Sequence, residues 1–262
     1  MPIDTALVGA LHVDYLQSQD LAGAEPLHHT LFQTSTIDAL LDGNYDGDIS
    51  FTELQEHGDF GLGTLDALDG EMIALDGSFY QVRSDGRAYP VDGGTKTPFA
   101  VVTVFEPELC QTLDAATDLP GLCAIVDGLL GDNSICCAVR VDGSFEHVRT
   151  RSVPRQRKPY PPLVDVVENQ PIFELSGVRG SLVGFRFPDY AQGLNVAGYH
   201  FHFITADRSA GGHVLQCRLT GGGELRVDHE ADLRVELPSG VGLPVPDQTA
   251  ARRETLDRIE RE

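Results

Sequence analysis

Tryptophan is absent from this 262-residue chain, methionine occurs only twice, and cysteine is scarce. The five cysteines are odd in number and include no Cys-x-x-Cys pair, which argues against a disulfide framework and against a thiolate zinc site. Reduced thiols are the simpler interpretation, and they favour a cytoplasmic protein.

Long apolar runs and basic residues are also lacking. No segment approaches the ~20 apolar residues of a membrane span, and no basic region precedes the short apolar run at residues 6–10. With 19 basic against 40 acidic side chains, the formal charge of −21 repels nucleic acid and anionic membranes. We therefore expect no nucleic-acid or membrane partner, and an anionic substrate would need a local arginine or a metal.

The most informative stretch that is present is rich in histidine. Residues 199–203 read Tyr-His-Phe-His-Phe, so His200 and His202 share one face of a strand and the aromatic rings share the other. A polar loop over 205–212 then predicts a hairpin that brings His213 beside the pair. Three neutral imidazoles suit a divalent transition metal, and three protein ligands leave a coordination position open for water or substrate.

Two other interpretations of this stretch stay open. Histidines on a strand face can be half-exposed pairing residues, although three of the nine histidines within fourteen residues favour a ligand set. A cupin-like oxygenase also uses His-x-His on a strand, but it adds a carboxylate a few residues later. Only Asp207 is available for that purpose.

Residues 42–53 match the pattern of an EF-hand calcium loop. They place Asp, Asn, Asp, Gly, Asp and Glu at positions 1, 3, 5, 6, 7 and 12 of the loop. Against calcium, the preceding helical segment is barely two turns long, and Ser50 with Glu53 resembles a capping box that begins a short helix. We favour an acidic surface turn.

The remaining patterns predict a strand-rich chain. Asp-Gly pairs at 76–77 and 142–143 predict two hairpin turns, and residues 109–130 have the composition of helical segments interrupted near Pro120. From residue 172 to 237 one strand follows another.

We therefore expect an α+β protein with two closely packed β-rich domains, mixed or antiparallel sheets and few short helices. The predicted divisions are an N-terminal extension over 1–27, an N-terminal α/β domain over 28–160, and a C-terminal β-rich, metal-binding domain over 161–262. The tail of the last domain is helical in composition and is expected to return to the site.

Several longer motifs carry a family resemblance. They are Ser35-Thr-Ile-Asp-Ala-Leu-Leu-Asp-Gly, His57-Gly-Asp-Phe-Gly-Leu-Gly-Thr, Leu68-Asp-Gly-Glu71, Arg149-Thr-Arg151-Ser-Val-Pro, Gln170-Pro-Ile-Phe, Val178-Arg-Gly-Ser-Leu-Val-Gly-Phe, and Gly198-Tyr-His-Phe-His-Phe followed by Gly-Gly-His213. Together, from about residue 30 to 237, they resemble the α-acetolactate decarboxylase family.

The resemblance implies a zinc enzyme that converts 2-acetolactate to (R)-acetoin and CO2. It assigns His200, His202 and His213 as the zinc ligands, Glu71 as a catalytic glutamate and Arg151 as the catalytic arginine. Zinc chelated by the substrate's carbonyl and hydroxyl oxygens would stabilise the enediolate that forms when CO2 leaves. The arginine would orient the departing carboxylate, and a glutamate would deliver the proton to one face.

The family also uses a glutamate from the C-terminal tail. Glu260 fits best, with Glu254 and Glu262 as rivals. Family members are dimers, so we expect a homodimer. The alternatives from other functional classes are a non-enzymatic acidic metal-binding module and a cupin-like metal oxygenase.

Overall fold

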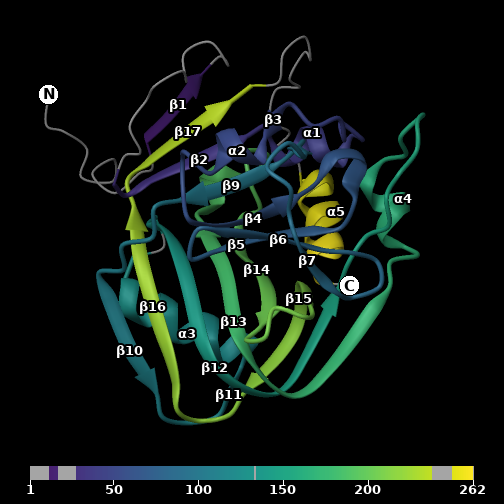
Figure 1. Ribbon diagram of the computed structural model, residues 1–262. Coiled ribbons are helices and arrows are strands. Elements are labelled where there is room, and N and C mark those ends of the chain that lie inside the picture. Colours follow the sequence, from purple (N-terminus) through teal and green to yellow (C-terminus); the bar gives the residue numbers. More distant parts are fainter. Residues whose placement is uncertain (1–11, 17–27, 133, 238–249, 262) are drawn as a thin grey trace, which may run out of the picture.

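The computed structural model describes residues 12–16, 28–132, 134–237 and 250–261. Two β-sheets dominate it: one runs across the upper part of the molecule in Figure 1, and the strands of the other run down the lower part. The prediction of a β-rich α+β protein with few short helices is confirmed.

The upper sheet has eight strands and is mixed. Its order is β1 (His12–Leu16), β17 (Asp232–Glu236), β2 (Thr30–Thr34), β9 (Ala100–Thr103), β4 (Phe60–Thr64), β5 (Glu71–Leu75), β6 (Ser78–Val82) and β7 (Ala88–Pro90). Strand β17 runs parallel to both β1 and β2, whereas the other neighbours are antiparallel. A short pair, β3 (Ile49–Ser50) with β8 (Lys96–Thr97), forms a separate ladder.

The lower sheet has seven antiparallel strands. Its order is β10 (Leu109–Leu113), β16 (Gly223–Glu230), β12 (Cys136–Arg151), β13 (Ile172–Phe187), β14 (Gly198–Thr205), β15 (Gly211–Leu219) and β11 (Thr117–Asp118). The second half of β12 also pairs with β15, so β12, β13, β14 and β15 form a closed ring of hydrogen-bonded strands. In this ring the end of β12 lies beside the start of β15, although the two strands are far apart in the sequence.

Five α-helices occur in the described part of the chain: α1 (Ile37–Leu41), α2 (Phe51–Leu54), α3 (Leu119–Leu130), α4 (Leu163–Val167) and α5 (Ala250–Arg261). The predicted capping box is present, and α1 has a hydroxyl cap. The Thr36 hydroxyl accepts from Ala39 N at the start of α1, and Ser50 and Glu53 form the capping box of α2. None of these helices has the length and apolar character that a membrane crossing needs.

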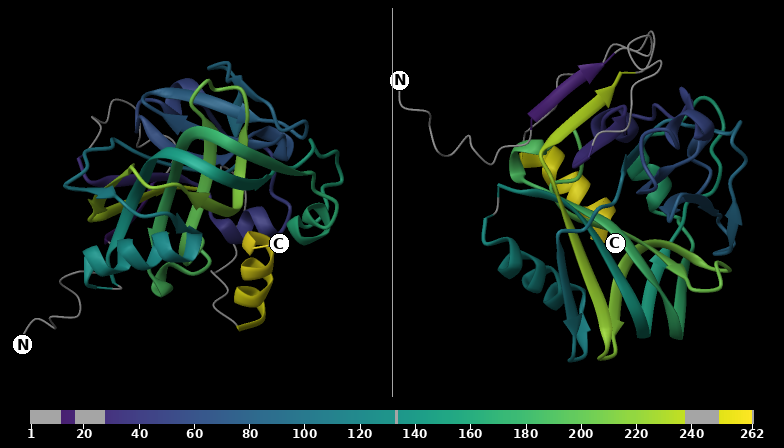
Figure 2. Two further views of the ribbon diagram at one scale, coloured as in Figure 1. Left: turned by 90° about the horizontal axis from the view of Figure 1, so that it is seen from below. Right: turned by 60° about the vertical axis from the view of Figure 1, so that its left-hand side comes forward.

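The core has separate parts. One apolar cluster fills the space between the two sheets, with Leu62 and Val101 from the upper sheet meeting Val183 and Phe185 from the lower one. A second lies between the other face of the lower sheet and α3, and a third joins α1, α4 and α5. In the left view of Figure 2, α3 (teal) and α5 (yellow) lie apart along the lower edge of the molecule.

One hairpin prediction is confirmed and the other is wrong. Asp76 and Gly77 make the turn between β5 and β6, with positive φ at both residues, as such two-residue turns require. Asp142 and Gly143 instead lie inside the 16-residue strand β12, paired with β13. The Asp142 carboxylate accepts from Arg140 Nε at 2.7 Å and from the Ser181 hydroxyl at 2.6 Å, so it is held within the sheet.

The prediction of helical segments over 109–130 is half wrong. Residues 109–113 form β10, and Pro120 does not interrupt a helix but lies in the first turn of α3. The missing N–H of proline is harmless there, because the first amides of a helix lack intrahelical partners. The Asp118 carboxylate caps the helix by accepting from Gly121 N at 2.9 Å.

The two sheets interleave along the chain. Strands β10, β11 and β12 precede residue 160 but belong to the lower sheet, whereas β17 follows it but belongs to the upper sheet. The change of sheet therefore does not coincide with residue 160, and the division into domains over 28–160 and 161–262 stays a prediction. Of the extension over 1–27, the structure describes β1, which pairs with β17.

The carboxylates of the calcium-like loop over 42–53 face separate protein partners. Asp46 accepts from Lys158 Nζ at 2.6 Å, Asp42 accepts from Arg252 Nη2 at 2.8 Å, and Glu53 is engaged by its capping box. These contacts describe the acidic surface turn that the sequence favoured.

Candidate metal centre and acid pair

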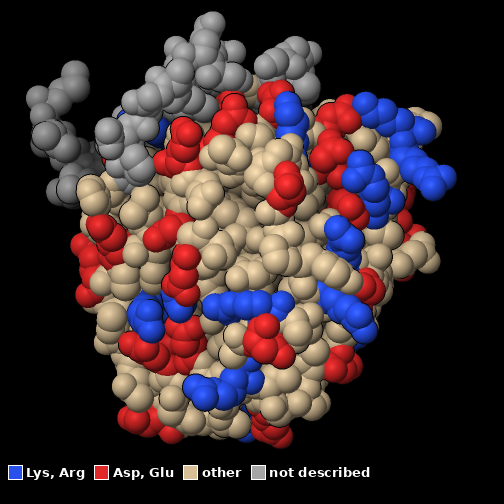
Figure 3. All heavy atoms as spheres, viewed as in Figure 1, with Lys and Arg blue, Asp and Glu red and all other residues tan. Residues whose placement is uncertain are grey.

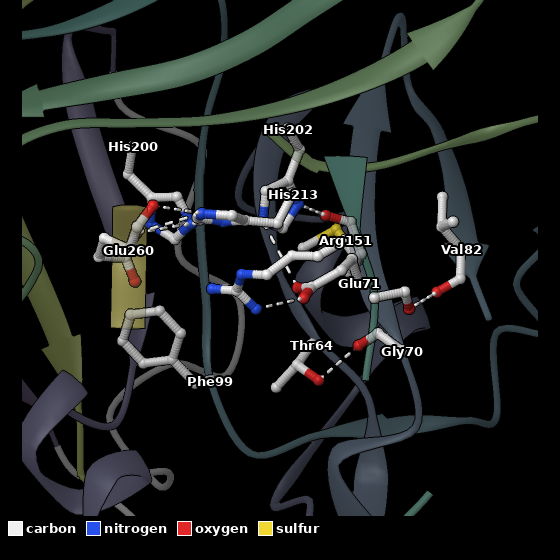
Figure 4. A network of polar contacts seen from close by, with 12 residues as sticks. Thr64, Gly70, Glu71, Val82, Phe99, Arg151, His200, His202, His213 and Glu260 are labelled. Carbon is white, nitrogen blue, oxygen red and sulfur yellow. Dashed lines mark hydrogen bonds and ion pairs between the residues drawn. The ribbon is translucent and has the colours of Figure 1, made fainter. Parts of the chain in front are cut away.

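The histidine hairpin forms as predicted and buries all three imidazoles. His200 and His202 come from β14, and His213 lies directly opposite His202 in β15. The ring centroids are 4.8 Å apart for His200 and His213, 5.1 Å for His200 and His202, and 5.5 Å for His202 and His213 (Figure 4). Each residue is at most 8% exposed.

Gly212 permits the close approach of a third strand. Its φ is +135°, and a Cβ atom there would lie 2.4 Å from the Arg151 carbonyl oxygen. A side chain at this position would push β12 away from β15, so glycine is needed for the backbones to meet. Arg151 is thereby paired with His213 in the strand register.

Arg151 and Glu71 form a buried ion pair beside the imidazoles. Arg151 Nη1 lies 3.2 Å from Glu71 Oε1, and the two side chains are 6% and 9% exposed. The other carboxylate oxygen of Glu71 is 3.5 Å from His202 Nε2. Glu71 begins β5 in the upper sheet and Arg151 ends β12 in the lower one, so this pair spans the two sheets.

The proton position on His202 follows from its partner. Nδ1 lies 2.8 Å from the Met72 carbonyl oxygen, which can only accept, so Nδ1 carries the proton and Nε2 keeps a lone pair. That Nε2 is buried and has no hydrogen-bond partner among the described residues. An imidazole whose second nitrogen is fixed in this way is typical of a metal ligand.

Helix α5 closes the site from the opposite side to β5. Its Leu256 and Ile259 are almost fully buried in the cluster that includes α1 and α4. Glu260 then points inward, with Oε2 at 3.6 Å from His200 Nε2 and 3.7 Å from His213 Nε2. Arg151 Nη2 donates to the Ile259 carbonyl at 3.2 Å, which ties the helix to the site.

Of the three tail glutamates proposed from the sequence, Glu260 is the one that the structure brings to the histidines. Glu254 is exposed on the same helix, and Glu262 lies outside the described residues. The apolar spacing of Leu256 and Ile259 in an otherwise charged tail is the sequence signal for this docking.

Burial sets the protonation of the site. It raises the pKa of Glu71 and of Glu260 to about 7 each, although the Arg151 charge lowers both. Burial lowers the pKa of His200 to about 3 and that of His213 well below its usual value, with Arg151 acting in the same direction. The imidazoles are therefore neutral at physiological pH, as ligation of a cation requires.

Two imidazole nitrogens and one carboxylate oxygen that are buried at this site fit a transition metal ion, whereas the buried Nε–H of Arg151 fits a hydrogen-bond acceptor. Four side-chain atoms are buried without a hydrogen-bond partner in the described structure: Arg151 Nε, His200 Nδ1, His202 Nε2 and Glu260 Oε2. Buried polar groups are normally satisfied, so such a concentration calls for a ligand. The three imidazoles are one of two groups in the described residues with metal-binding spacing.

The other sequence candidates lie elsewhere. Asp207 is exposed in the β14–β15 turn, where its carboxylate accepts from Ser209 N at 3.1 Å. Arg155, in the segment that follows β12, pairs with Asp66 at an exposed position, so Arg151 is the buried cation at the histidines. On the face drawn in Figure 3, acidic and basic side chains are interspersed.

The model of a family described as alpha-acetolactate decarboxylase matches residues 31–241. The chain belongs to this family. It is 52% identical over 210 residues to the alpha-acetolactate decarboxylase of Methylococcus capsulatus, covering 80% of each chain. It is 47% identical over 231 residues to that of Methanosarcina mazei, covering 88% of this chain and 80% of the relative.

A solved structure gives the same result for the fold. The alpha-acetolactate decarboxylase from Bacillus subtilis superposes with a TM-score of 0.84 at 38% identity, covering 88% of this chain and 99% of that chain. Family membership argues against the non-enzymatic metal-binding module and against the cupin-like oxygenase.

Proposed function

We propose that this protein is a zinc-dependent decarboxylase that converts 2-acetolactate to (R)-acetoin and CO2. Family membership supports the reaction. The observation that supports the mechanism is the convergence of three neutral imidazoles, one arginine and two carboxyl groups in a single buried site.

His200, His202 and His213 would hold the zinc. When bound, it supplies Lewis-acid stabilisation of the negative charge that decarboxylation leaves on the substrate. The buried, unpartnered Nε2 of His202 supports this assignment, because such an atom is costly to bury without a ligand. Imidazole donors suit zinc among the divalent transition metals, and the resemblance to the family makes zinc the ion of this proposal.

Arg151 would bind the substrate carboxylate. Its guanidinium is fixed by Glu71 and by the Ile259 carbonyl, while its Nε remains buried and unpartnered. In a chain of net charge −21, this local positive charge is what allows an anionic substrate to be held. Fixing the carboxylate orients the bond that breaks.

Glu71 and Glu260 would divide proton delivery and hydroxyl orientation. They flank the imidazoles from two elements, with Glu71 Oε2 near His202 and Glu260 Oε2 near His200. A carboxyl group with a pKa of about 7 is present in both protonation states at neutral pH, so it can donate a proton and regain it.

Substrate would enter past α5. The cavity between the imidazoles, Glu71 and Arg151 measures about 40 Å³, which is close to the volume that one water molecule occupies. A neighbouring cavity of about 810 Å³ shares His213 and Glu260 as lining residues. Movement of Glu260 would therefore open a path from the larger cavity to the imidazoles.

The test is acetoin and CO2 production from racemic 2-acetolactate, measured on the protein as purified, after chelation and after zinc return. Activity that is lost with the chelator and restored by zinc is the expected result. No activity in folded, zinc-loaded protein would refute the proposal.

The acid roles are tested by Glu71→Gln and Glu260→Gln, with Glu254→Gln as the control on the exposed face of α5. Loss of a positioned acid lowers the rate by about 10²–10⁴-fold. Near-normal turnover with unchanged acetoin stereochemistry in Glu71→Gln would remove Glu71 from the mechanism.

A homodimer and a cytoplasmic location belong to the same proposal. The five cysteines are all free, which is compatible with a reducing compartment. Sedimentation of the purified protein tests the dimer.

A further inference from the structure

A second group of ionisable side chains lies where the lower sheet passes into the upper one. Strand β16 ends at Glu230, and β17 begins at Asp232 in the other sheet. At this crossing the backbone N–H of Ala231 donates to the His29 carbonyl at 3.0 Å, just before β2. In Figure 1 the crossing is at the left side of the molecule, where β16 leads up to β17.

Four residues at this crossing form what we call the junction cluster: His29, Glu108, Asp228 and Glu230. Ligand atoms of His29, Glu108 and Asp228 all lie within 4.8 Å of one another. His29 Nδ1 is 2.8 Å from Asp228 Oδ1, and the Asp228 side chain has no exposed surface. The other Asp228 oxygen accepts from Glu106 N at 2.6 Å, which fixes the carboxylate.

Glu230 is the observation that points to a ligand. It is only 4% exposed, and both of its carboxylate oxygens are buried without a hydrogen-bond partner in the described structure. It lies two residues after Asp228 in the same strand, so both side chains leave the same face of the sheet. The nearby Thr103 hydroxyl donates to the Thr30 carbonyl instead.

The cluster concentrates negative charge. Burial raises the pKa of Glu230 well above its usual value, the neighbouring Asp228 and Glu108 charges raise it further, and the nearby Thr103 hydroxyl acts in the opposite direction. The ion pairs made by Glu108 and Asp228 are with imidazoles, His229 at 2.6 Å and His29 at 2.8 Å. The Glu230 carboxyl group therefore lies close enough to two carboxylates to feel their charge, and a divalent cation bound there would take the place of its proton.

We propose that the junction cluster binds a divalent cation of the Mn²⁺ or Zn²⁺ type. The imidazole of His29 and the carboxylates of Glu108 and Asp228, with the unpartnered Glu230 beside them, make a donor set richer in oxygen than the three-imidazole site, and carboxylates suit Mn²⁺. The cation would bridge the segment before β2, the segment before β10 and the end of β16. Its role is structural: it joins the two sheets at a point far from the proposed reaction.

The test uses the zinc-loaded protein, so that the three imidazoles are already filled. Mn²⁺ is titrated in, and the free ion is followed by electron paramagnetic resonance while zinc content is measured by mass spectrometry. The expected result is one Mn²⁺ bound per chain with zinc retained. Release of one zinc per Mn²⁺ bound would overturn the proposal, and so would the absence of Mn²⁺ binding.

Two variants of equal charge sharpen the assignment. Glu108→Gln removes a proposed ligand and Glu106→Gln removes a neighbouring carboxylate that pairs with His28, and both glutamates are about half exposed. Loss of a ligand weakens Mn²⁺ binding by at least about tenfold, whereas the control retains it. Equal weakening in both variants would overturn the proposal, because it would reduce the effect to general electrostatics.

Thermal unfolding gives a second readout. A ligand that binds only the folded protein raises Tm by mass action. Mn²⁺ is therefore expected to raise Tm of the wild type and of Glu106→Gln but not of Glu108→Gln. The same rise in all three proteins would contradict a cation at the junction cluster. Neither assay depends on decarboxylase activity.

Discussion

The three-imidazole site and the junction cluster both contain histidine, but the imidazoles of the first are buried whereas the His29 side chain of the second is 35% exposed. In the first, His200 faces two other imidazoles and Arg151, and burial lowers its pKa to about 3. In the second, His29 faces carboxylates, and the Asp228 carboxylate raises its pKa against the opposing effect of burial. Full burial keeps the His200 imidazole neutral, whereas the partly exposed His29 is raised in pKa by its carboxylate neighbour, so a cation at the junction cluster would take the place of the His29 proton.

The chemistry expected of each region follows from this difference. The first site presents nitrogen lone pairs beside carboxyl groups that can carry protons, which suits a Lewis acid and proton transfer. The junction cluster presents oxygen-rich negative charge at the contact between two sheets, which suits a bridging cation.

The largest effect is expected from removing an imidazole from the first region. His202→Ala takes away the nitrogen that has no other partner. We therefore expect loss of zinc and a decrease in the rate by about 10³-fold or more. Zinc content and acetoin production measure this. His229→Ala, which changes a partly exposed imidazole next to the junction cluster, should keep both. Retention of zinc by His202→Ala would disprove the ligand assignment.

Arg151→Lys tests whether the positive charge alone is sufficient. Lysine keeps the charge but cannot contact Glu71 and the Ile259 carbonyl with the same fork, so a charge-assisted hydrogen bond worth about 1.5–3 kcal/mol is lost. We expect kcat/KM to fall about 10–100-fold. Arg155→Lys, at an exposed pair with Asp66, is the matched control. Equal behaviour of the two variants would exclude a special role for the Arg151 fork.

Leu256→Ala tests the docking of α5, a helix that contributes a residue to the three-imidazole site and none to the junction cluster. The side chain is 2% exposed, and its truncation should weaken docking by about 2–5 kcal/mol. Hydrogen exchange of the α5 amides should accelerate by about 30-fold or more, with lower turnover because Glu260 is displaced. Unchanged exchange would show that other contacts hold the helix. Glu254→Ala, exposed on the same helix, is the control.

The smallest effect is expected at His57, a histidine that belongs to neither region. Its ring stacks on Phe32 with centroids 3.9 Å apart, and burial lowers its pKa. Because the pKa of His57 is lower in the folded protein than in the unfolded chain, folding favours the neutral ring. The contribution of His57 to the free energy of unfolding is therefore fully present above the unfolded-chain pKa of about 6.5. It is lost as the pH falls below that value through the folded pKa.

His57→Gln should therefore flatten the acid side of the stability profile measured by denaturant unfolding. The change in unfolding free energy between neutral and mildly acidic pH should be smaller than in the wild type. An unaltered pH profile would assign the acid sensitivity to other groups.

Local patterns in the sequence were sufficient to predict several features of the structure. Alternation over 199–203 predicts the shared face of His200 and His202, and hydroxyl and Asp-Gly signals predict the caps of α1 and α2 and the β5–β6 turn. These features depend on side-chain periodicity and on hydrogen bonds between residues a few positions apart, which the sequence lists directly.

Only the tertiary structure decided the rest. The Asp-Gly pair in β12 stays extended because strands on both sides hydrogen-bond to it, and this overrides its local preference for a turn. Glu71, Arg151 and Glu260 come from three distant segments that meet because two sheets pack and α5 docks. The sequence by itself determined the hairpin and its ligand face, whereas long-range pairing and burial determined which acids, and with what charge, face the histidines.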